Sequence, residues 1–403
     1  MTQTHLPVFD PWSESFRENP FKAYEDLRAR GDVFENPDGS WVITSYEVCA
    51  RLLKDRKRLR RYPDRSLLAF PEGRFRDYNL YTMPFMDPPD HPRVRNSVAA
   101  VFTPRALASM ETAVRAACDE LIGELAQQET FDFAKDFAGP FPLYVICRML
   151  GVPLDERELF RHGADAVTAG LEPAASAEVL AAAASACEDL AATLEVYVAE
   201  RRGSNGTDII SLLLSQEAAT DLSHDELINQ LIFLLLAGHE TTATLLNMGM
   251  KLLMEDLALA QRLRDDPSLI AVAVEEFLRL HPSLHFIKYY AAEAIEVGDV
   301  VIPADSEIVF LLASANRDPL QFPDPDAVDV TRTNATRQLA FSVGPHTCLG
   351  NNLARMEARV AFQEILTKMP KLRIDGEPVQ NSKIVFQGLE SLPVRQHERE
   401  PAM

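Results

Sequence analysis

The chain has 403 residues, of which 47% are hydrophobic and 25% charged, values that are ordinary for a globular protein with a large buried core. Its 40 basic and 60 acidic side chains give a net charge of −20, which argues against nucleic acid or an anionic membrane surface as the main partner. The longest apolar run, Leu231 to Ala237, is too short to span a bilayer, and the polar N-terminus lacks the layout of a signal peptide.

The first quarter of the chain is predicted to mix helix with a little strand. A helix is predicted from Ser13 to Arg30, with Ser13 as its N-cap. A hairpin is predicted from Asp32 to Ser45, turning at Asn36-Pro-Asp-Gly39. The stretch from Arg61 to Pro92 is rich in proline, and we predict one long irregular loop of a kind that is often functional.

The middle of the chain has a helical pattern almost throughout. It runs from Pro104 to about Arg264 and is interrupted at Pro153 and at Gly203 to Thr207. One long helix is predicted from Asp225 to Asp256, and another from Asp266 to Leu280.

The last third of the chain is predicted to return to short strands and coil. Ile287 to Phe310 alternates as strands do, and Asn316 to His346 is a proline-studded coil. A helix begins near Leu349 and ends at Pro370, and short strands follow from Leu372 to Val394. The fold class is therefore mainly α with minor β, in a single domain over residues 1–403 with disorder-prone ends at about 1–10 and 396–403.

The five cysteines argue against a disulfide framework or a zinc knuckle, because their number is odd and none forms a C-x-x-C pair. This cysteine usage fits a reducing cytoplasm. Cys118, Cys147 and Cys187 lie in apolar helical stretches and are predicted to be core residues. Cys348 alone has polar, glycine-rich flanks. The others are Cys49, Cys118, Cys147 and Cys187.

Cys348 lies in a predicted tight turn at the start of a helix, where backbone N–H groups and the helix dipole favour a thiolate. A cysteine nucleophile would need an imidazole base, and His346, two residues away around a turn, need not face the thiol. Zinc would need three or four ligands, whereas haem needs a single thiolate because the porphyrin supplies four nitrogens. On this turn alone, a hydrolase, a zinc site and a haem site all stay open.

The turn Phe341-Ser-Val-Gly-Pro-His-Thr-Cys-Leu-Gly350 resembles the haem-binding signature of the cytochrome P450 family. The resemblance implies that Cys348 is the axial ligand of haem iron, that Phe341 packs beside the sulfur and that His346 reaches a haem propionate. Gly350 is the last glycine of the signature. Ser342 stands where the family commonly has glycine. This position requires only a backbone angle that serine can also adopt.

A second motif, Ala237-Gly-His-Glu-Thr-Thr242, interrupts an apolar helix with a glycine, an acid and two hydroxyls. Glycine in a helix interior costs about 1 kcal/mol relative to alanine, and a threonine bonded to its own backbone can bend the helix. Taken alone, the motif fits a polar wedge at a helix crossing as well as a proton relay. The resemblance places it on the long distal helix of the family, with Thr241 contacting dioxygen and Glu240 relaying protons.

Two more motifs resemble the family's pattern around the haem. Glu276-Phe-Leu-Arg279 is similar to its buried E-x-x-R motif, which an arginine from the following coil, here Arg332, completes. This triad is expected to be structural rather than catalytic.

His91 and Arg95, four residues apart on one predicted helix, resemble the family's helix that binds haem propionates. Lys288 stands where a further propionate arginine is usual. Lysine supplies the charge but not the bidentate fork, so whether it replaces that arginine stays open.

The resemblance spans Pro84 to Arg355 by motif and is closest to the bacterial, cytoplasmic branch of the family. It implies a haem b monooxygenase that inserts one oxygen atom of O2 into a hydrophobic small molecule of the terpenoid, polyketide, steroid or aromatic class. Electrons would come from an external ferredoxin with an NAD(P)H-dependent ferredoxin reductase. We expect a monomer without nucleic-acid or membrane partners, and a docking surface for the acidic ferredoxin on the basic run Arg51 to Arg65.

The substrate pocket is the part of the site that the sequence predicts in least detail. The resemblance assigns its lid to Arg65 to Phe85, where Arg74 and Arg76 could hold a substrate carboxylate. The alternative functions are a peroxide-driven oxygenase, a haem-thiolate sensor or carrier, and a cysteine hydrolase without haem. The intact Glu240–Thr241 pair argues against the first two, and the combination of motifs against the third.

Overall fold

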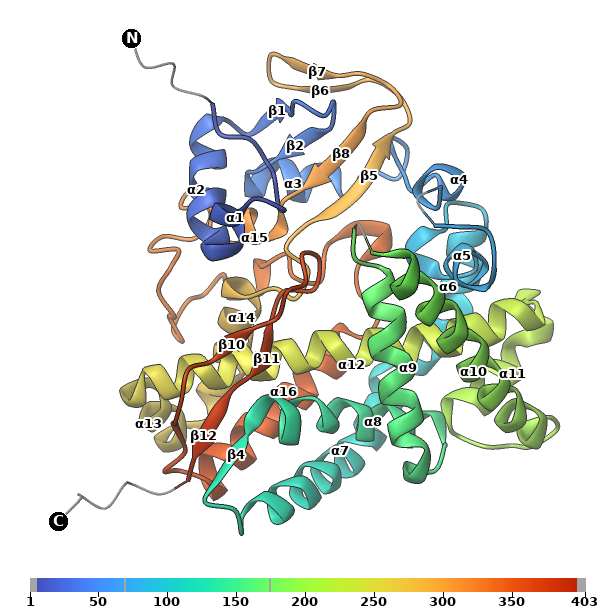
Figure 1. Cartoon of the computed structure of the whole chain (residues 1–403), viewed down its shortest axis with the longest axis vertical. Helices are drawn as coiled ribbons and strands as arrows, with labels where there is room; N and C mark the ends of the chain where they lie inside the picture. Colours follow the sequence, from blue (N-terminus) through green and yellow to red (C-terminus); the bar gives the residue numbers. More distant parts are fainter. Residues whose placement is uncertain (1–5, 69, 174, 397–403) are drawn as a thin grey trace. The chain divides into compact units, whose positions relative to one another are not determined.

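The structure is a computed structural model that describes residues 6–68, 70–173 and 175–396 (Figure 1). Its internal contacts divide the chain into two units. Helices account for 57% of the residues and the sheets are small, which confirms the predicted mainly α class with minor β. The organisation as one domain over residues 1–403 stays a prediction. Unit 1 is built from Met1–Tyr62, Glu275–Cys348 and Ile384–Gln387, and unit 2 from Pro63–Val274, Leu349–Lys383 and Gly388–Met403.

Unit 1 contains a five-stranded sheet with the strand order β1-β2-β8-β5-β3, in which β2 and β8 pair in parallel. Successive side chains of a strand point to opposite faces, so the sheet contributes to two cores. Val42 packs with Tyr24 on one face, whereas its neighbour Ile43 packs with Phe310 on the other. The strands of unit 1 are β1 (Val33–Glu35), β2 (Trp41–Ile43), β3 (Leu59–Arg60), β5 (Ile287–Ala291), β6 (Ile295–Val297), β7 (Val300–Ile302) and β8 (Glu307–Phe310).

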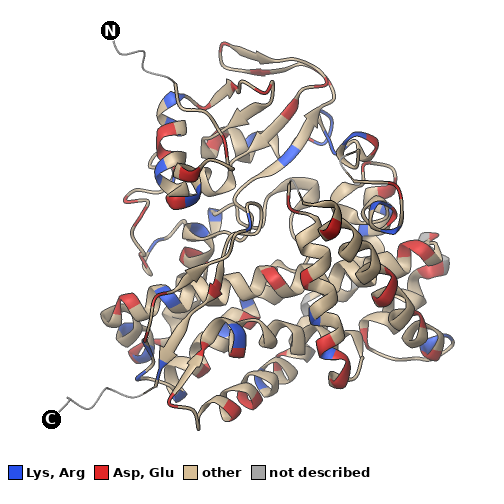
Figure 2. Ribbon diagram, viewed as in Figure 1, with Lys and Arg blue, Asp and Glu red and all other residues tan. Residues whose placement is uncertain are grey.

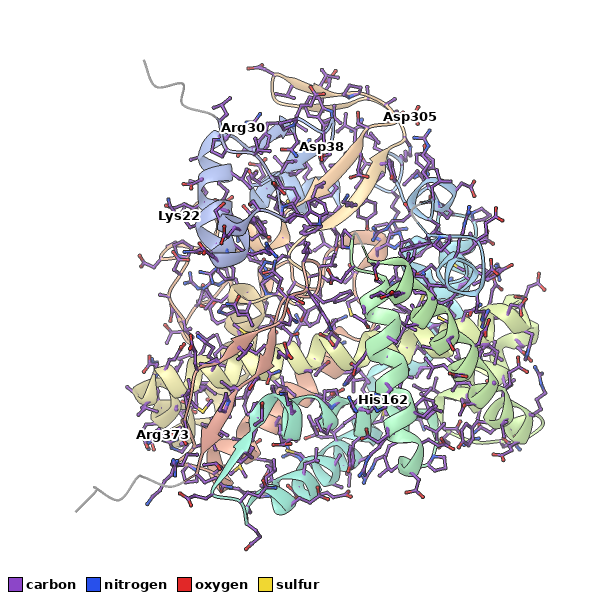
Figure 3. The ribbon with its side chains drawn as sticks, viewed as in Figure 1. Lys22, Arg30, Asp38, His162, Asp305 and Arg373 are labelled. Carbon is purple, nitrogen blue, oxygen red and sulfur yellow. The ribbon has the colours of Figure 1, made fainter. Side chains whose placement is uncertain are left out.

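The hairpin predicted from Asp32 to Ser45 is confirmed as β1 and β2. Its turn is closed by the N–H of Gly39, which donates to the carbonyl of Asn36 at 2.9 Å. Asp38, labelled in Figure 3, accepts the backbone N–H of Ser40 at 3.0 Å. Gly39 has a φ of 85°, a left-handed angle that glycine adopts without strain.

The helix predicted from Ser13 to Arg30 is wrong in one respect, because the structure has two helices there. The side chain of Asn19 accepts the N–H of Lys22 and starts a second helix with Pro20 at its first position. Ser13 is the N-cap of the first helix, as predicted. The helices of unit 1 are α1 (Glu14–Glu18), α2 (Pro20–Arg30), α3 (Tyr46–Leu52) and α15 (Leu312–Ala315), and α14 (Ile270–Leu280) contains the unit boundary at Glu275.

The predicted disorder-prone ends lie partly outside the described residues, at 1–5 and 397–403. Each end has one buried residue in its described part, Phe9 and Gln396. Phe9 is buried against Phe16 and Phe286, with ring centroids 5.8 and 5.2 Å away. Gln396 is buried and donates to the carbonyl oxygens of Leu125 and Gln128.

Unit 2 is a helical assembly around α12, which packs against α8, α9, α10 and α16 (Figure 1). A capping box between Ser223 and Glu226 starts α12, which confirms the long helix predicted from Asp225 to Asp256. The helices of unit 2 are α4 (Pro63–Ser66), α5 (Arg74–Leu80), α6 (Asp90–Ala99), α7 (Pro104–Leu125), α8 (Pro140–Leu150), α9 (Arg157–Gly170), α10 (Ala177–Arg201), α11 (Ile209–Thr220), α12 (His224–Glu255), α13 (Leu257–Asp265) and α16 (Asn351–Lys368).

The structure corrects two predictions in unit 2. The stretch from Arg61 to Pro92 is not one irregular loop, because it contains α4 and α5 and the start of α6. Phe75 and Tyr78, three residues apart on α5, are both buried and hold that helix in place. A short strand, β4 (Thr130–Asp132), also interrupts the region predicted to be helical.

The remaining strands confirm the prediction for the end of the chain. They form a three-stranded sheet in the order β4-β12-β9 and a pair β10-β11. Their bounds are β9 (Arg373–Ile374), β10 (Val379–Gln380), β11 (Leu389–Ser391) and β12 (Pro393–Arg395). The short 3₁₀ and π turns are η1 (Met83–Phe85), η2 (Ala100–Phe102), η3 (Ala134–Ala138), η4 (Leu154–Glu156), η5 (Pro267–Leu269), η6 (Ala335–Arg337) and η7 (Gly344–His346).

By length and apolar composition alone, α12 is the one helix within the described ranges that could cross a membrane. The most apolar part of α12 is 61% buried inside the protein. A central helix of a folded core has the same composition, so this signal is weak evidence for a membrane span.

Candidate active site

The cysteine turn in unit 1 is held by its own backbone. The N–H of Cys348 donates to the carbonyl of Phe341 at 3.0 Å, and the hydroxyl of Thr347 donates to the carbonyl of Gly344 at 2.8 Å. Ser342 has a φ of 55°, the left-handed region where glycine is at ease, and its N–H donates to Leu339 at 2.8 Å. Serine therefore adopts the angle that the prediction required.

Gly344 is required by close packing within unit 1. A Cβ at this position would lie 2.2 Å from the carbonyl oxygen of Leu53, and its φ of 82° is also left-handed. The next turn carries His346, whose ring packs edge-on against Tyr289 with the centroids 5.8 Å apart. The turn is thus rigid around the residue that it presents, Cys348, whose side chain is exposed.

The other four cysteines are poor candidates for a thiolate. All four are buried, which confirms the prediction for Cys118, Cys147 and Cys187. Burial raises the pKa of Cys118, Cys147 and Cys187 to about 12, and it raises the pKa of Cys49 as well. Burial therefore disfavours the thiolate form in these four residues, whereas Cys348 is exposed.

Both predicted catalytic side chains of the polar motif in α12 have partners within unit 2. The hydroxyl of Thr241 donates to the carbonyl of Ala237 at 2.8 Å, the backbone bond anticipated for this threonine. The carboxylate of Glu240 forms an ion pair with Lys383 at 2.7 Å. Glu240 and Lys383 keep 17% and 23% of their side-chain surface exposed, so this pair meets solvent.

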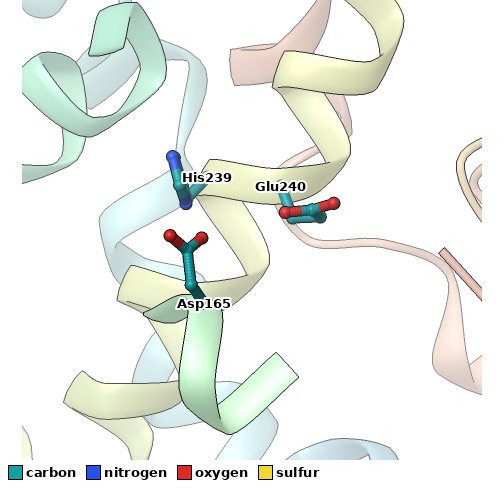
Figure 4. Close-up of side chains that lie close together, drawn as sticks. All are labelled: Asp165, His239 and Glu240. Carbon is teal, nitrogen blue, oxygen red and sulfur yellow. The ribbon is translucent and has the colours of Figure 1, made fainter. Parts of the chain in front are cut away.

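Asp165 of α9 lies near the same turn of α12. Figure 4 shows its carboxylate facing the imidazole of His239, and one ligand atom each of Asp165, His239 and Glu240 lies within 4.8 Å of the other two. Burial lowers the pKa of His239, so the ring is neutral near pH 7. We assign no metal to this group, because the ammonium of Lys383 already neutralises Glu240 and would repel a cation.

The predicted propionate residues occupy different environments. His91 and Arg95 both lie on α6, with His91 buried and Arg95 half-buried. Lys288 on β5 is ion-paired with Glu307 at 2.7 Å, and its side chain is 45% exposed. Gly350 is the N-cap of α16, and its carbonyl accepts the N–H of Ala354 at 2.9 Å.

The predicted site residues are divided between the two units. Nothing in either group tests their predicted roles toward a cofactor, which stay predictions. Phe341, His346, Cys348 and Lys288 belong to unit 1, and His91, Arg95, Glu240, Thr241 and Gly350 belong to unit 2.

The buried triad predicted in unit 1 is confirmed. Glu276 and Arg279 have no exposed side-chain surface and pair at 2.7 Å. Arg332 reaches the second oxygen of Glu276 at 3.1 Å. Arg279 also donates to the carbonyl of Asn316 at 3.1 Å, so the triad ties α14 to the coil that leads to the cysteine turn.

Comparisons with known proteins show the family of the chain. The family model for cytochrome P450 matches residues 176–268 and 267–380. The biotin biosynthesis cytochrome P450 of Bacillus subtilis is 31% identical, over 95% of this chain and 97% of its own length. The chain belongs to the cytochrome P450 family.

Other P450 relatives match equally completely. The 6-deoxyerythronolide B hydroxylase of Saccharopolyspora erythraea is 33% identical, over 96% of this chain and 98% of its own length. The crystal structure of a myxobacterial cytochrome P450 in complex with myristic acid superposes with a TM-score of 0.84 at 34% identity, covering 96% of this chain and 98% of that one. This P450 is therefore an oxidoreductase of the monooxygenase class, and haem is the cofactor of its family.

The cysteine turn fits the haem of a P450. Haem brings four nitrogen ligands and asks the protein for one thiolate. The turn offers one exposed cysteine, on a backbone closed by its own hydrogen bonds. The donor set of unit 1 therefore suits the family's cofactor.

Sequence reasoning missed two charged residues near the polar motif of α12, Lys383 and Asp165. Lys383 is 143 positions away from Glu240 in the sequence and belongs to no motif. Asp165 lies in the middle of an ordinary amphipathic helix. No sequence signal points to either residue, because each is brought to α12 by the packing of unit 2.

Proposed function

We propose that this P450 is a haem b monooxygenase that oxidises a hydrophobic small molecule with electrons from an external ferredoxin. The observation that carries the proposal is the exposed Cys348 in a backbone-closed turn. Haem, when bound, supplies an iron centre that activates dioxygen. Cys348 would hold the iron through its thiolate, and backbone N–H groups near the sulfur would temper its charge.

The other predicted site residues would act around this centre. His91, Arg95, His346 and Lys288 carry the charges and hydrogen-bond donors that a haem propionate needs, and Lys288 would first have to exchange its partner Glu307. Glu240 would take up protons from solvent and Thr241 would hand them on, because an acid beside an alcohol can hold and move a proton.

The substrate is proposed to be apolar. The relatives support this class, because one is named as a hydroxylase of 6-deoxyerythronolide B and another was crystallised with myristic acid. Within the proposed class, hydroxylation or epoxidation of a terpenoid, polyketide, steroid or aromatic compound is the expected reaction. Whether Arg74 or Arg76 on α5 anchors a substrate acid stays a prediction.

An acidic ferredoxin is proposed to dock on the basic segment between α3 and β3. Figure 2 shows consecutive basic positions along this segment. Its exposed cations are Lys54, Arg56, Lys57 and Arg58, and Arg51 is exposed in the last turn of α3. The segment lies against the cysteine turn within unit 1, because the Cα of Lys54 would be 2.9 Å from a Cβ at Gly344. Electrons delivered there would enter close to Cys348.

Arg61 does not belong to this docking surface. Its guanidinium lies 3.9 Å from the ring centroid of Tyr289 and donates to the carbonyl of Lys288 at 2.6 Å. Because these contacts engage the guanidinium within unit 1, we leave Arg61 out of the proposed docking surface. We further propose that the enzyme is a cytoplasmic monomer.

The decisive test is the spectrum of the purified, reduced protein under carbon monoxide. We expect the red-shifted band of a thiolate-ligated haem, and loss of that band in Cys348→His. Turnover should then require a surrogate ferredoxin, its reductase and NAD(P)H. Absence of the band, or efficient turnover with peroxide but none with the ferredoxin system, would contradict the proposal.

A further inference from the structure

The ion pair between Glu240 and Lys383 joins two distant parts of unit 2. Lys383 Nζ lies 2.7 Å from Glu240 Oε1, and the lysine belongs to the connection between β10 and β11. Both side chains are less than a quarter exposed. A charge-assisted hydrogen bond of this length fixes the direction of the carboxylate.

The backbone around Lys383 is itself fixed against α12. The N–H of Asn381 donates to the carbonyl of Gly388 at 3.0 Å, which closes the base of the connection. A Cβ at Gly388 would lie 2.8 Å from the hydroxyl oxygen of Thr244, one helical turn beyond Glu240. The connection therefore presents Lys383 to Glu240 from a backbone that touches the same helix.

Within the described ranges, Lys383 is the one residue that forms an ion pair with Glu240. Asp165 and the neutral His239 lie on another side of this turn of α12 (Figure 4), where Asp165 pairs with Arg161 at 3.2 Å. The hydroxyl of Thr241 points back to Ala237. The carboxylate of Glu240 is therefore held by Lys383 and not by the hydroxyl of Thr241, to which it would pass a proton.

We propose that Lys383 is a positioning residue for Glu240, a role that rests on the proposed proton relay. The ammonium holds the carboxylate toward solvent, where Glu240 accepts a proton from a hydronium ion and leaves water. Once protonated, the neutral carboxylic acid is attracted less strongly by the ammonium. It can then turn and give the same proton to the side of Thr241, after which the regenerated carboxylate returns to Lys383. The lysine stays an ammonium throughout, so one proton moves and no other bond changes.

The test compares Lys383→Met with Lys383→Arg and with Lys371→Met, which removes an exposed lysine elsewhere in unit 2. The readouts are product formed per NAD(P)H consumed, peroxide released and the solvent deuterium isotope effect, measured with the reconstituted ferredoxin system. We expect Lys383→Met to lower coupled product formation about tenfold, less than the roughly 10²-fold typical for loss of a proton-transfer group. Lys383→Arg should restore most of it, and Lys371→Met should match the parent enzyme.

Glu240→Gln separates this inference from the proposed function. If Glu240→Gln keeps full coupling, the proton relay itself is wrong. If Glu240→Gln is impaired but Lys383→Met, with an unchanged reduced carbon monoxide spectrum, couples like Lys371→Met, then the positioning role alone is overturned. The double variant should be no worse than Glu240→Gln, because both changes act on one step.

Discussion

Arg332 reaches the buried carboxylate of Glu276 with 3.1 Å between Nε and Oε2, although 56 positions separate the two residues in the sequence. Glu276 binds Arg279 through both of its oxygens, at 2.7 and 2.9 Å. Two guanidinium groups thus share one carboxylate, and no side chain of the triad is more than 6% exposed. Such a network is costly to break, because the remaining charges stay buried without a counterion.

Replacement of Glu276 by Gln should therefore lower the free energy of unfolding by about 3–5 kcal/mol. The variant should also purify with little haem, because the coil that carries Arg332 leads to the cysteine turn. Denaturant titration and the haem-to-protein absorbance ratio measure the two effects. Glu296→Gln, at an exposed position on β6, is the matched control and should change neither. Normal stability and haem loading of Glu276→Gln would contradict the structural role of the triad.

Charge reversal on the basic segment should slow electron delivery. The triple variant Lys54→Glu, Arg56→Glu, Lys57→Glu replaces exposed cations, so we expect slower reduction by ferredoxin and a weaker dependence of the rate on salt. Stopped-flow reduction at several ionic strengths measures both. Lys371→Glu alters an exposed lysine in unit 2 and serves as the control. Equal rates and equal salt slopes for the triple variant and the parent enzyme would exclude this docking surface.

Two helical glycines should respond in opposite ways to alanine. A Cβ at Gly238 in α12 would meet Ile146 at no less than 3.8 Å, so Gly238→Ala should raise the unfolding free energy by up to about 1 kcal/mol. A Cβ at Gly170 in α9 would lie 2.7 Å from that of Ala183 and 2.8 Å from Phe75, so Gly170→Ala should destabilise the protein by about 1–3 kcal/mol. Thermal and urea unfolding compare the two. The same sign for both would show that packing at these sites has been misjudged.

The buried His285 should make the protein sensitive to acid. Burial, with help from the nearby Arg317 guanidinium, lowers the pKa of His285 to about 3, against about 6.5 in an unfolded chain. Between these values the unfolded state binds one proton more than the folded state. Stability is therefore full above about pH 6.5 and falls as the pH drops toward 3, by roughly 1 kcal/mol per pH unit.

Urea unfolding at about pH 6 and pH 5 tests this slope. His285→Gln keeps a polar partner for Tyr24, whose hydroxyl lies 3.3 Å from His285 Nδ1, but removes the titration, so its slope should be smaller. His162 on α9 is labelled in Figure 3, and its side chain is 70% exposed. His162→Gln should keep the parent slope. Identical slopes for the parent and His285→Gln would show that this histidine does not govern acid sensitivity.

The elements predicted best from the sequence are those whose local signals agree. Ser223 and Glu226 cap a long apolar period, and the helix that follows is α12. Asn36 to Gly39 combines the residues of a tight turn, and the hairpin forms there. Local propensity and tertiary packing favour the same structure in both cases.

The missed elements are those whose stability comes from outside their own segment. In α5, Phe75 and Tyr78 sit in a stretch whose prolines and glycines suggest a loop, and burial of the two rings outweighs that signal. β4 has only three residues and exists because β12, more than 250 positions later, pairs with it. The break at Asn19 did have a local signal, an N-cap followed by proline, that the helical period obscured.

The candidate site shows the same division. The cysteine turn and the α12 motif are contiguous in the sequence, so their residue types could be identified directly. Lys383 could not, because its position beside Glu240 depends on how the β10–β11 connection folds onto α12. Contiguous motifs reveal the chemistry, whereas the charges that adjust it are set by tertiary structure.

The contact between Gly344 and Leu53 leaves no layer of side chains between the basic segment and the cysteine turn. Side-chain layers absorb small displacements by changing rotamer, whereas two backbones in contact can only move together. A protein that presses on the basic segment would therefore shift the turn mechanically as well as electrostatically. Binding of an electron donor would therefore shift the backbone around Cys348 even before any electron is transferred.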